Sequence, residues 1–454
     1  MTVETDEAYA PGTARRAGPH AARWRPVWSA AAVVVLTFIA WFRLPSMTRG
    51  TVWAEDGGVF LRDILSLGEL RSITVPYDGY LHVVPRTVAS LASTVAPVDA
   101  YAGAMSFLSC FVVAAVAVAV FFLSRSVLES AALRAMLAVI PILLPVGPEE
   151  VLGNAANLHW YLLWLAPWLL LYKPTSRYGK AFLFAAALLT AASEIITVMF
   201  LPLALWTIVA RKNLWGATGL ILGVALQLLA TLTKPRFATL PAVDGLDPLS
   251  VIYGFFLMPL GSIWHADSRT LGSTIGSVGG WALVVPVVLL LAMVAYTVVV
   301  GRPALKLAAL GLLTSAALCW TASVVLSGNG MFGYAKYVGT DWTAGFGYIR
   351  YAAAPAMFLL ALVPIFVAAV AERGVAKSGR SSAFIAAAFA AVLLGSYFPA
   401  ATTRQTGPDW AAGVAEARAT CTANRALESA TVLVAPTVWK FARVPVPCAR
   451  LLDR

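Results

Sequence analysis

Ala100–Leu123 reads AYAGAMSFLSCFVVAAVAVAVFFL and contains no charged residue. A bilayer core of about 30 Å requires about 20 apolar residues in an α-helix, so this stretch is long enough to cross a membrane. Similar runs recur along a chain that is 60% hydrophobic and only 12% charged, whereas soluble domains contain about a quarter charged residues. The sequence therefore predicts an all-α polytopic membrane protein with about eleven transmembrane helices.

The predicted spans are apolar runs that end at polar or basic residues: Val27–Leu44, Ala100–Leu123, Leu133–Val146, Trp160–Tyr172, Ala181–Ala192, Ile195–Ala210, Leu214–Leu232, Trp281–Val300, Leu307–Leu326, Ala352–Val370 and Phe384–Phe398. We expect residues 1–26 to form a disordered cytoplasmic arm. Residues 27–399 then form the transmembrane domain, and residues 400–454 a small extracytoplasmic tail. Val251–Trp264 is short and interrupted by glycine, so we place it on the outer face.

Lys and Arg predict the orientation, because cytoplasmic loops carry an excess of both. Every predicted inner segment contains Lys or Arg, whereas most acids, together with His82, His159 and His265, fall in outer segments. The formal net charge of +11 therefore indicates membrane topology, and no nucleic-acid partner is expected. We expect a multi-pass protein of the inner (plasma) membrane, with a cytoplasmic N-terminus and any chemistry on the outer side.

Two cysteines fall in the predicted tail and two in predicted spans. Cys421 and Cys448 can form a disulfide if the tail faces an oxidising compartment. Cys110 and Cys319 lie in apolar spans and are expected to behave as small hydrophobic residues. No zinc-ligand spacing is present, so no cofactor or metal site is expected, and dependence on a divalent metal stays open.

The first outer loop, about residues 45–99, contains the acidic segment Trp53–Leu61 (WAEDGGVFL). Adjacent residues diverge by about 100° on a helix, so Glu55 and Asp56 are not expected to share one substrate face. Asp56 is the first candidate for a general base and Glu55 the second. The other acid then pairs with an arginine or, if it is Asp56, caps the following helix. The alternative interpretation is a solvated pair at the membrane boundary.

A second segment of this loop, Pro76–Arg86 (PYDGYLHVVPR), adds candidate substrate contacts, namely Asp78, Tyr80, His82 and Arg86. Helical spacing over 59–70 and 80–95 predicts two amphipathic helices on the outer membrane surface. Asp78 is either a turn residue or a substrate contact. His82 is either a buried structural histidine or a hydrogen-bond partner of substrate. Arg86 either binds an anionic headgroup or extends to lipid phosphates.

Polar residues at the outer end of the fourth span are further candidates. Asn157 and His159 suit sugar hydroxyls, and the neighbouring Trp160 suits stacking on a sugar ring. The competing interpretation is an aromatic belt at the membrane interface. Glu194 lies in the short turn between the fifth and sixth predicted spans. An acid at the membrane is costly and suggests function. The alternative is that Glu194 only provides the polar group that the turn needs.

A second outer loop ends at Gly347–Tyr351 (GYIRY), directly before the tenth span. Arg350 at that depth can hold a lipid phosphate through bidentate hydrogen bonds. Lys336 in the same loop and Tyr351 are grouped with it as substrate contacts. The alternative is that tyrosine and arginine only anchor the helix in the membrane.

These motifs together resemble the GT-C superfamily of membrane glycosyltransferases. The resemblance rests on the acidic first outer loop, the Pro76–Arg86 segment, the GYIRY motif and about eleven spans. It implies a polyprenyl-phosphate-linked sugar as donor and a glycan or lipid of the cell envelope as acceptor. Asp56, beside Glu55, matches the acidic position of the family, and Arg350 matches the position that contacts phosphate. The chain departs from larger members because it lacks a large C-terminal carbohydrate-binding domain.

The implied reaction inverts the anomeric centre, with one carboxylate as base and a phosphate that leaves directly. It needs no second acid, unlike glycoside hydrolysis. A transporter or flippase of a lipid-linked saccharide is the alternative; it predicts ionisable residues within spans and inverted repeats. A membrane acyltransferase is a third option and would require an intramembrane histidine.

Overall fold

The computed structural model describes residues 19–234, 247–327, 330–373, 380–399 and 402–453. The first part of the chain contains α1 (Pro19–Arg43), α2 (Ser46–Gly50), η1 (Asp56–Leu61), α3 (Arg62–Leu67), α4 (Glu69–Ser72), α5 (Val83–Val95), η2 (Val98–Ala100), α6 (Tyr101–Leu123), η3 (Ser124–Ser126), α7 (Ala131–Leu143), η4 (Gly147–Val151), α8 (Leu158–Leu171), α9 (Arg177–Ala191), η5 (Ile195–Phe200), α10 (Leu201–Val209) and α11 (Leu214–Thr233).

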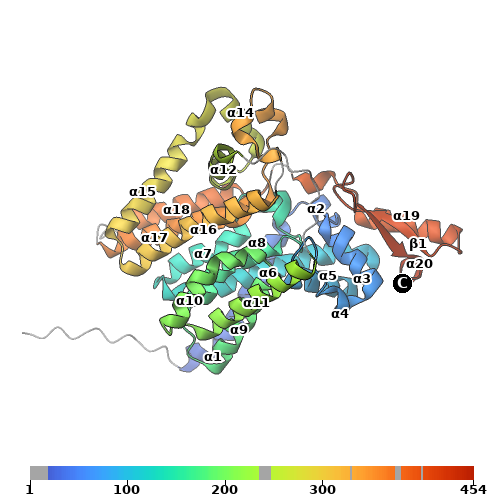
Figure 1. The fold of residues 1–454 in the computed structure, drawn as a ribbon, viewed down its shortest axis with the longest axis horizontal. Coiled ribbons are helices and arrows are strands. Elements are labelled where there is room, and N and C mark those ends of the chain that lie inside the picture. Colours follow the sequence, from blue (N-terminus) through green and yellow to red (C-terminus); the bar gives the residue numbers. More distant parts are fainter. Residues whose placement is uncertain (1–18, 235–246, 328–329, 374–379, 400–401, 454) are drawn as a thin grey trace, which may run out of the picture.

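The second part contains α12 (Pro248–Phe255), η6 (Phe256–Leu260), α13 (Gly261–Trp264), α14 (Ser268–Val278), η7 (Gly279–Leu283), α15 (Val284–Val300), α16 (Pro303–Ser327), η8 (Gly330–Phe332), η9 (Tyr334–Lys336), η10 (Asp341–Gly345), η11 (Arg350–Ala352), α17 (Ala353–Glu372), α18 (Arg380–Gly395), η12 (Thr403–Thr406), α19 (Trp410–Ala423), β1 (Ser429–Leu433), β2 (Arg443–Pro447) and α20 (Cys448–Leu452). Long helices form a bundle, and the C-terminal segment projects from one end of it (Figure 1).

Five helical segments of the described chain are long and apolar enough to cross a membrane: Val98–Ser126, Leu214–Thr233, Ser268–Val300, Pro303–Ser327 and Arg350–Glu372. Six shorter apolar helices accompany them. This is the composition of a predominantly helical membrane protein, and the count of eleven spans is not confirmed. The N-terminal arm was predicted too long, because α1 already begins at Pro19; residues 1–18 lie outside the described residues.

Two helices lie inside the bundle. Every residue of α8 from Leu158 to Leu170 is buried, and α17 is buried along most of its length. A helix that is apolar on all sides is expected to be surrounded by others. α17 packs on α16, α15, α7 and α8, and α8 also packs on α6 and α9. The loops that precede α8 and α17 are therefore held at one end of the bundle by two rigid helices.

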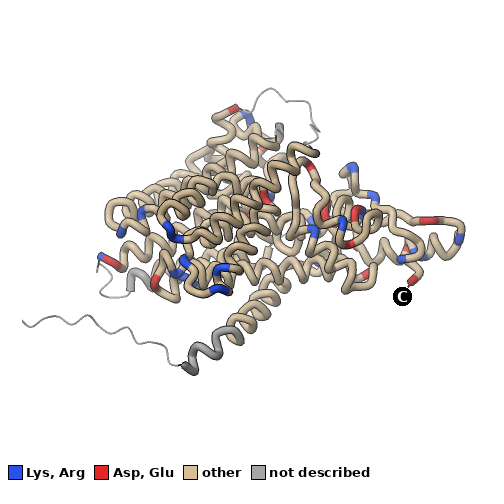
Figure 2. The backbone as a smooth tube through the Cα atoms, turned by 60° about the horizontal axis from the view of Figure 1, so that its bottom comes forward, with Lys and Arg blue, Asp and Glu red and all other residues tan. Residues whose placement is uncertain are grey.

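Charge differs between the two ends of the bundle. The end that carries the C-terminal segment contains most of the acids, whereas Lys and Arg predominate at the opposite end (Figure 2). At that opposite end, Arg302 pairs with Glu129 and Glu372.

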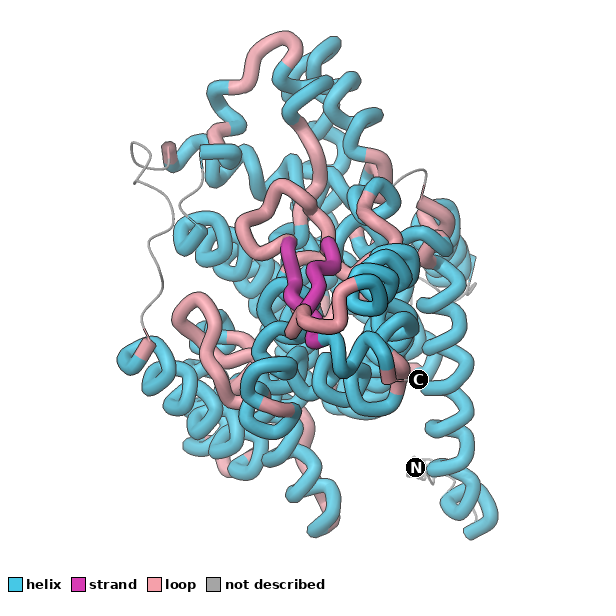
Figure 3. The backbone as a smooth tube through the Cα atoms, turned by 90° about the vertical axis from the view of Figure 1, so that its right-hand side faces the viewer, coloured by secondary structure: helices cyan, strands magenta, loops and turns pink. Residues whose placement is uncertain are grey.

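The C-terminal segment, residues 402–453, is a small folded unit and not only helical. β1 and β2 pair antiparallel, with Ser429 opposite Pro447 and Leu433 opposite Arg443. Alternate residues of both strands are buried, as expected for a sheet with one covered face. Strand β1 packs on α19, and strand β2 packs on α3 and η1; Figure 3 shows the two strands in magenta. The sequence analysis did not predict these strands.

Cys421 and Cys448 form a disulfide that joins α19 to α20. They lie 27 residues apart, so the loop-entropy estimate gives about 3 kcal/mol of stabilisation. We expect the C421S/C448S double variant to lose about that much stability of the segment. Limited proteolysis should then cleave residues 402–453 faster than in the wild type, with the bundle unchanged. Equal cleavage rates, or free thiols in wild type purified without reductant, would contradict this expectation.

Candidate active site

Glu55 and Asp56 lie where the chain turns into η1. Ala54 has a φ of +38°, and its N–H donates to the carbonyl of Ala435 in the C-terminal segment at 2.5 Å. The two acids then diverge, as expected for neighbours at the start of a helix. Asp56 lies inside η1, and neither acid caps this helix through its side chain, so the capping interpretation of Asp56 is wrong.

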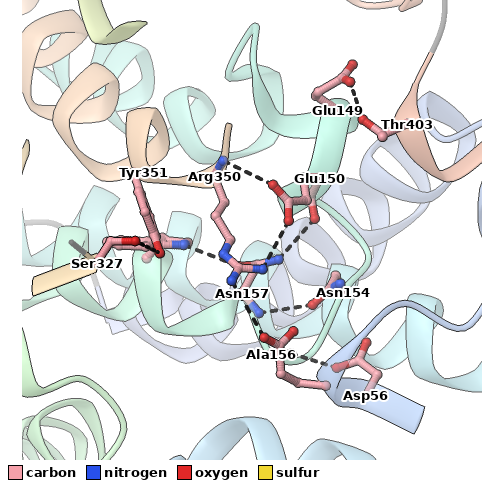
Figure 4. Close-up of polar contacts among 12 residues, drawn as sticks. Asp56, Glu149, Glu150, Asn154, Ala156, Asn157, Ser327, Arg350, Tyr351 and Thr403 are labelled. Atoms are coloured by element: carbon pink, nitrogen blue, oxygen red, sulfur yellow. Dashed lines mark hydrogen bonds and ion pairs between the residues drawn. The ribbon is translucent and has the colours of Figure 1, made fainter. Parts of the chain in front are cut away.

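Asp56 is buried, and backbone amides bind its carboxylate. Oδ1 accepts from the N–H of Ala156 at 2.8 Å and Oδ2 from the N–H of Ala155 at 3.0 Å. Only 2% of the residue is exposed. The hydroxyl of Tyr101 donates to the backbone carbonyl of Asp56 at 3.0 Å. Asp56 therefore links the start of η1 to the loop before α8 (Figure 4).

The loop before α8 has the conformation that presents these two amides. Gly153 has a φ of +70°, a region that favours glycine, and its Cα faces the side chain of Leu44. The Oδ1 atom of Asn154 accepts from the N–H of Asn157 at 3.0 Å. This local hydrogen bond closes the turn around Ala155 and Ala156, so that both N–H groups point to one carboxylate.

Burial raises the pKa of Asp56 to about 7, although the amides of Ala156 and Ala155 and the charge of Arg404 oppose the shift. We expect the thermal stability of the protein to fall as pH rises from about 4 to about 7. In that range the folded state binds the proton that the unfolded state has released, so the free energy of unfolding is larger at low pH.

The variant Asp56→Asn should lose this pH dependence, because its side chain does not titrate. The measurement is Tm in detergent across this pH range for both proteins. A difference in Tm that is the same at every pH would contradict the expectation.

Glu55, Glu150 and Arg350 form what we call the acid–arginine cluster. The Nη1 of Arg350 donates to Glu150 Oε1 at 3.0 Å, and its backbone N–H donates to Glu150 Oε2 at 3.2 Å. Its Nη2 lies 3.6 Å from Glu55 Oε1, which is longer than a hydrogen bond. Glu55 Oε2 is buried and has no hydrogen-bond partner among the described residues. The cluster thus contains one firmly bound carboxylate and one with a free oxygen.

His159 and Glu194 form a second buried pair. His159 Nδ1 and Glu194 Oε2 are in direct contact, and Glu194 Oε1 accepts from the N–H of Ile196 at 2.7 Å. The ring centroid of His82 lies 6.5 Å from that of His159 and 4.0 Å from that of Tyr80. Burial, together with His159 and Arg86, lowers the pKa of His82 well below its usual range, so its imidazole is neutral.

Tyr80 connects this pair to the acid–arginine cluster. Burial raises the pKa of Tyr80 well above its usual range, and the charges of Glu194 and Glu55 add to the shift while Arg350 opposes it. The phenol is therefore neutral and able to donate a hydrogen bond. Four separate parts of the sequence therefore meet here, because the charges of Glu55, Glu194 and Arg350 all act on Tyr80.

Aromatic side chains line the same region. The ring of Tyr351 lies 5.8 Å from those of Trp160 and Phe332, and its hydroxyl lies 3.4 Å from Ser327 Oγ. Trp160 and Tyr161 are buried inside the protein. The aromatic-belt interpretation is therefore wrong for Trp160, because residues of a belt face lipid.

Other predicted site residues make protein contacts. Asn157 donates to the carbonyl of Glu150 at 3.1 Å and accepts from Trp160 Nε1 at 3.3 Å. Asp78 has a φ of +49° between the paired Tyr77 and Tyr80, which is the geometry of a tight hairpin turn.

Two predicted cations form no ion pair with the cluster among the described residues. Arg86 is 1% exposed and pairs with Asp63 at 2.8 Å. The expectation that it contacts headgroups at the surface is therefore wrong; it packs over the ring of Phe60 at 4.8 Å. Lys336 is exposed on η9 and takes part in none of the described ion pairs.

Sequence reasoning did not assign roles to two residues that organise the site. Glu150 falls in a loop with two adjacent acids, and that acidic pair before α8 was the available signal. Arg404 is 1% exposed and donates to the carbonyls of Leu152, Gly153 and Thr48. Nothing in the sequence around Arg404 distinguishes it from the other arginines of the C-terminal segment.

A cavity of about 860 Å³ lies between the C-terminal segment and residues 61–101, and is lined by Leu61, Tyr101, Arg418 and Arg450 among others. The acid–arginine cluster does not line it. The described residues contain no group of three or more His, Cys, Asp or Glu side chains placed to hold a metal ion. No family model, curated protein or solved structure matches the chain.

Proposed function

We propose that the protein is a membrane glycosyltransferase. It would move a sugar from a polyprenyl-phosphate donor to a glycan or lipid acceptor of the cell envelope. One observation carries the proposal: among the described residues, Glu55 has a buried carboxylate oxygen without a hydrogen-bond partner, and the neighbouring Arg350 makes no hydrogen bond through its Nη2. A proton acceptor next to a phosphate-binding group is what direct displacement of a lipid phosphate requires.

Glu55 takes the role of base in this proposal, and Asp56 the role of its anchor. Each oxygen of Asp56 already accepts a backbone N–H group, which occupies one of its lone pairs, and only 2% of the residue is exposed, so its carboxylate is less available to a substrate proton. Glu55 Oε2 has no such competitor among the described residues. The sequence made Asp56 the first candidate for the base and Glu55 the second. The hydrogen bonds of Asp56 favour the reverse order.

The reaction then proceeds in one displacement. Glu55 Oε2 accepts the proton of the acceptor hydroxyl as the hydroxyl oxygen bonds to the anomeric carbon. The bond between that carbon and the phosphate oxygen breaks, and the lipid phosphate leaves with the electron pair. Nη2 of Arg350 binds the phosphate as its charge grows. Attack opposite to the leaving group inverts the anomeric centre.

The buried polar groups around the cluster suit a sugar ring. Tyr80 and His82 offer neutral hydrogen-bonding groups, His159 lies next to His82, and the rings of Trp160 and Tyr351 lie beside them. Sugars are bound by such combinations of hydroxyl partners and aromatic faces. In this proposal, Glu194 fixes the orientation of His159.

The proposal also includes an orientation. The acid-rich end of the bundle and the C-terminal segment face outward, and the end rich in Lys and Arg faces the cytoplasm. Two arguments favour this orientation. A disulfide such as Cys421–Cys448 forms in an oxidising compartment, and Lys and Arg accumulate on the cytoplasmic side. About eleven spans result if most of the shorter apolar helices also cross the plasma membrane.

The test is a transfer assay with purified protein in nanodiscs. Synthetic polyprenyl-phosphate sugars serve as donors and cell-envelope glycan fragments as acceptors, with product and free polyprenyl phosphate quantified. Release of polyprenyl phosphate together with an inverted glycoside is the expected result. Movement of intact donor across the bilayer of proteoliposomes, without cleavage at any donor tested, would indicate the flippase alternative instead.

A further inference from the structure

Arg404 is a buried guanidinium at the start of the C-terminal segment. Its Nη1 donates to the carbonyl of Leu152 at 2.9 Å, and its Nη2 donates to the carbonyls of Thr48 at 3.0 Å and Gly153 at 3.2 Å. No carboxylate among the described residues pairs directly with it. Burying a charge without a contacting counter-ion is costly, so these carbonyl bonds are its main compensation.

The carbonyls that Arg404 binds belong to the loop that holds Asp56. Leu152 and Gly153 directly precede Asn154, Ala155 and Ala156, and the latter two donate their N–H groups to Asp56. Arg404 is therefore connected to Glu55 through the loop at residues 152–156 and through Asp56, the next residue after Glu55. Burial lowers the pKa of Arg404 to about 10, and ionised Asp56 opposes this shift more than any other charged group does.

The rest of the C-terminal segment contacts the same two loops. Thr403 Oγ1 bonds to Glu149 Oε1, which is next to Glu150 of the acid–arginine cluster. The N–H of Ala435 donates to the carbonyl of Val52 at 3.0 Å, so a strand-like bridge covers the start of the acidic motif.

The two glycines of the acidic motif permit this close approach. A Cβ on Gly57 would lie 2.5 Å from Val434 Cγ1, and one on Gly58 would lie 2.5 Å from the carbonyl oxygen of Phe441. Cβ atoms essentially never come this close to other heavy atoms, so a larger residue at either position would force the C-terminal segment to shift. The motif is thus built to receive the C-terminal segment and not only to start a helix.

We propose that Arg404 is a positioning residue for the transfer reaction, and that the C-terminal segment completes the active site by holding the Gly153–Ala156 turn against Asp56 and thereby fixing Glu55. This inference rests on the proposed function. A planar guanidinium suits the role because it reaches three carbonyls in a fixed geometry, which a lysine ammonium does not reproduce. A displacement of about 1 Å in a catalytic group can lower turnover by about 10²-fold.

The test compares Arg404→Met and Arg404→Lys with a matched control, Arg418→Met. Arg418 lies in the same segment, its side chain is 39% exposed, and it is 3.9 Å from Asp99. Hydrogen exchange of residues 52–58 and 152–156 is measured by mass spectrometry, and kcat and the donor KM are measured in the nanodisc assay.

Arg404→Met should speed exchange in both stretches and lower kcat by about 10²-fold with little change in donor KM. Arg404→Lys should fall between this variant and wild type, and Arg418→Met should match wild type. Faster exchange with unchanged kcat would overturn the positioning role and leave Arg404 as a structural residue only. Unchanged exchange would overturn the proposal entirely.

Two further outcomes separate this inference from the proposed function. If wild type transfers no sugar from any donor, the proposed function fails, and the positioning role fails with it, while exchange still shows whether Arg404 holds the loop. If Arg404→Met does not fold, Arg404→Lys decides the proposal by the same two readouts, because it keeps the charge and most of the volume.

Discussion

Glu55→Gln is expected to lower kcat by about 10²–10⁴-fold, the usual effect of losing a general base. Glutamine keeps the size of the side chain and can still contact Arg350 through its amide oxygen. It cannot accept a proton at neutral pH, so the acceptor hydroxyl loses its base. Donor binding should change little, and circular dichroism and Tm should stay near wild type. The measurement is kcat and donor KM in the nanodisc assay.

Glu69→Gln is the matched control for this variant. Glu69 is another acid of the first outer loop, but it pairs with Arg450 at 3.0 Å, and its side chain is 41% exposed. We expect its kcat to be within about twofold of wild type, since exposed ion pairs contribute little. If Glu55→Gln remained fully active while Asp56→Asn became inactive without loss of Tm, the base would be Asp56 and the exchange of roles wrong.

Arg350→Ala is expected to raise the donor KM by about 10–100-fold, because a hydrogen bond to a charged group contributes about 1.5–3 kcal/mol. The variant loses the Nη2 donor that lies toward Glu55 and leaves Glu150 without its cation. Donor affinity is measured directly by binding of a polyprenyl-phosphate sugar in the absence of acceptor. Arg350→Lys should bind the donor with intermediate affinity, because an ammonium keeps the charge but not the planar fork.

Arg302→Ala is the control at the other end of the bundle, where Arg302 pairs with Glu129 and Glu372. Its donor affinity should match wild type. A fall in kcat without any change in donor binding in Arg350→Ala would contradict a phosphate-binding role. In that case Arg350 would serve only to orient Glu55 and Glu150.

Continuous apolar runs made the helices predictable. The predicted span Ala100–Leu123 corresponds to α6, Tyr101–Leu123, and the predicted surface helix ending at Val95 corresponds to α5. The periodicity of hydrophobic residues did not predict the two strands of the C-terminal segment. Each strand has only five residues in a polar stretch, so the alternation of apolar and polar residues is too short to recognise. The start of α1 was missed because basic and proline residues near Pro19 resemble an unstructured arm.

The sequence was enough to select residues that lie close together in the structure. It was not enough to predict which contacts they make. Glu55 and Arg350 lie far apart in the chain, and the shared outer side of the predicted topology was enough to group them. The capture of Asp56 by two backbone amides could not be predicted, because it depends on the conformation of a loop about 100 residues away. The role of Arg404 was missed for the same reason, since its partners are backbone carbonyls that carry no sequence signature.

In the proposed reaction, Glu55 is the base that deprotonates the acceptor hydroxyl as it displaces the lipid phosphate. The most direct measurement is the release of free polyprenyl phosphate by wild type and by Glu55→Gln, in nanodiscs with the same donor and acceptor. We expect acceptor-dependent release by wild type and a loss of about 10²-fold or more in the variant. Equal release by both proteins would rule out Glu55 as the base.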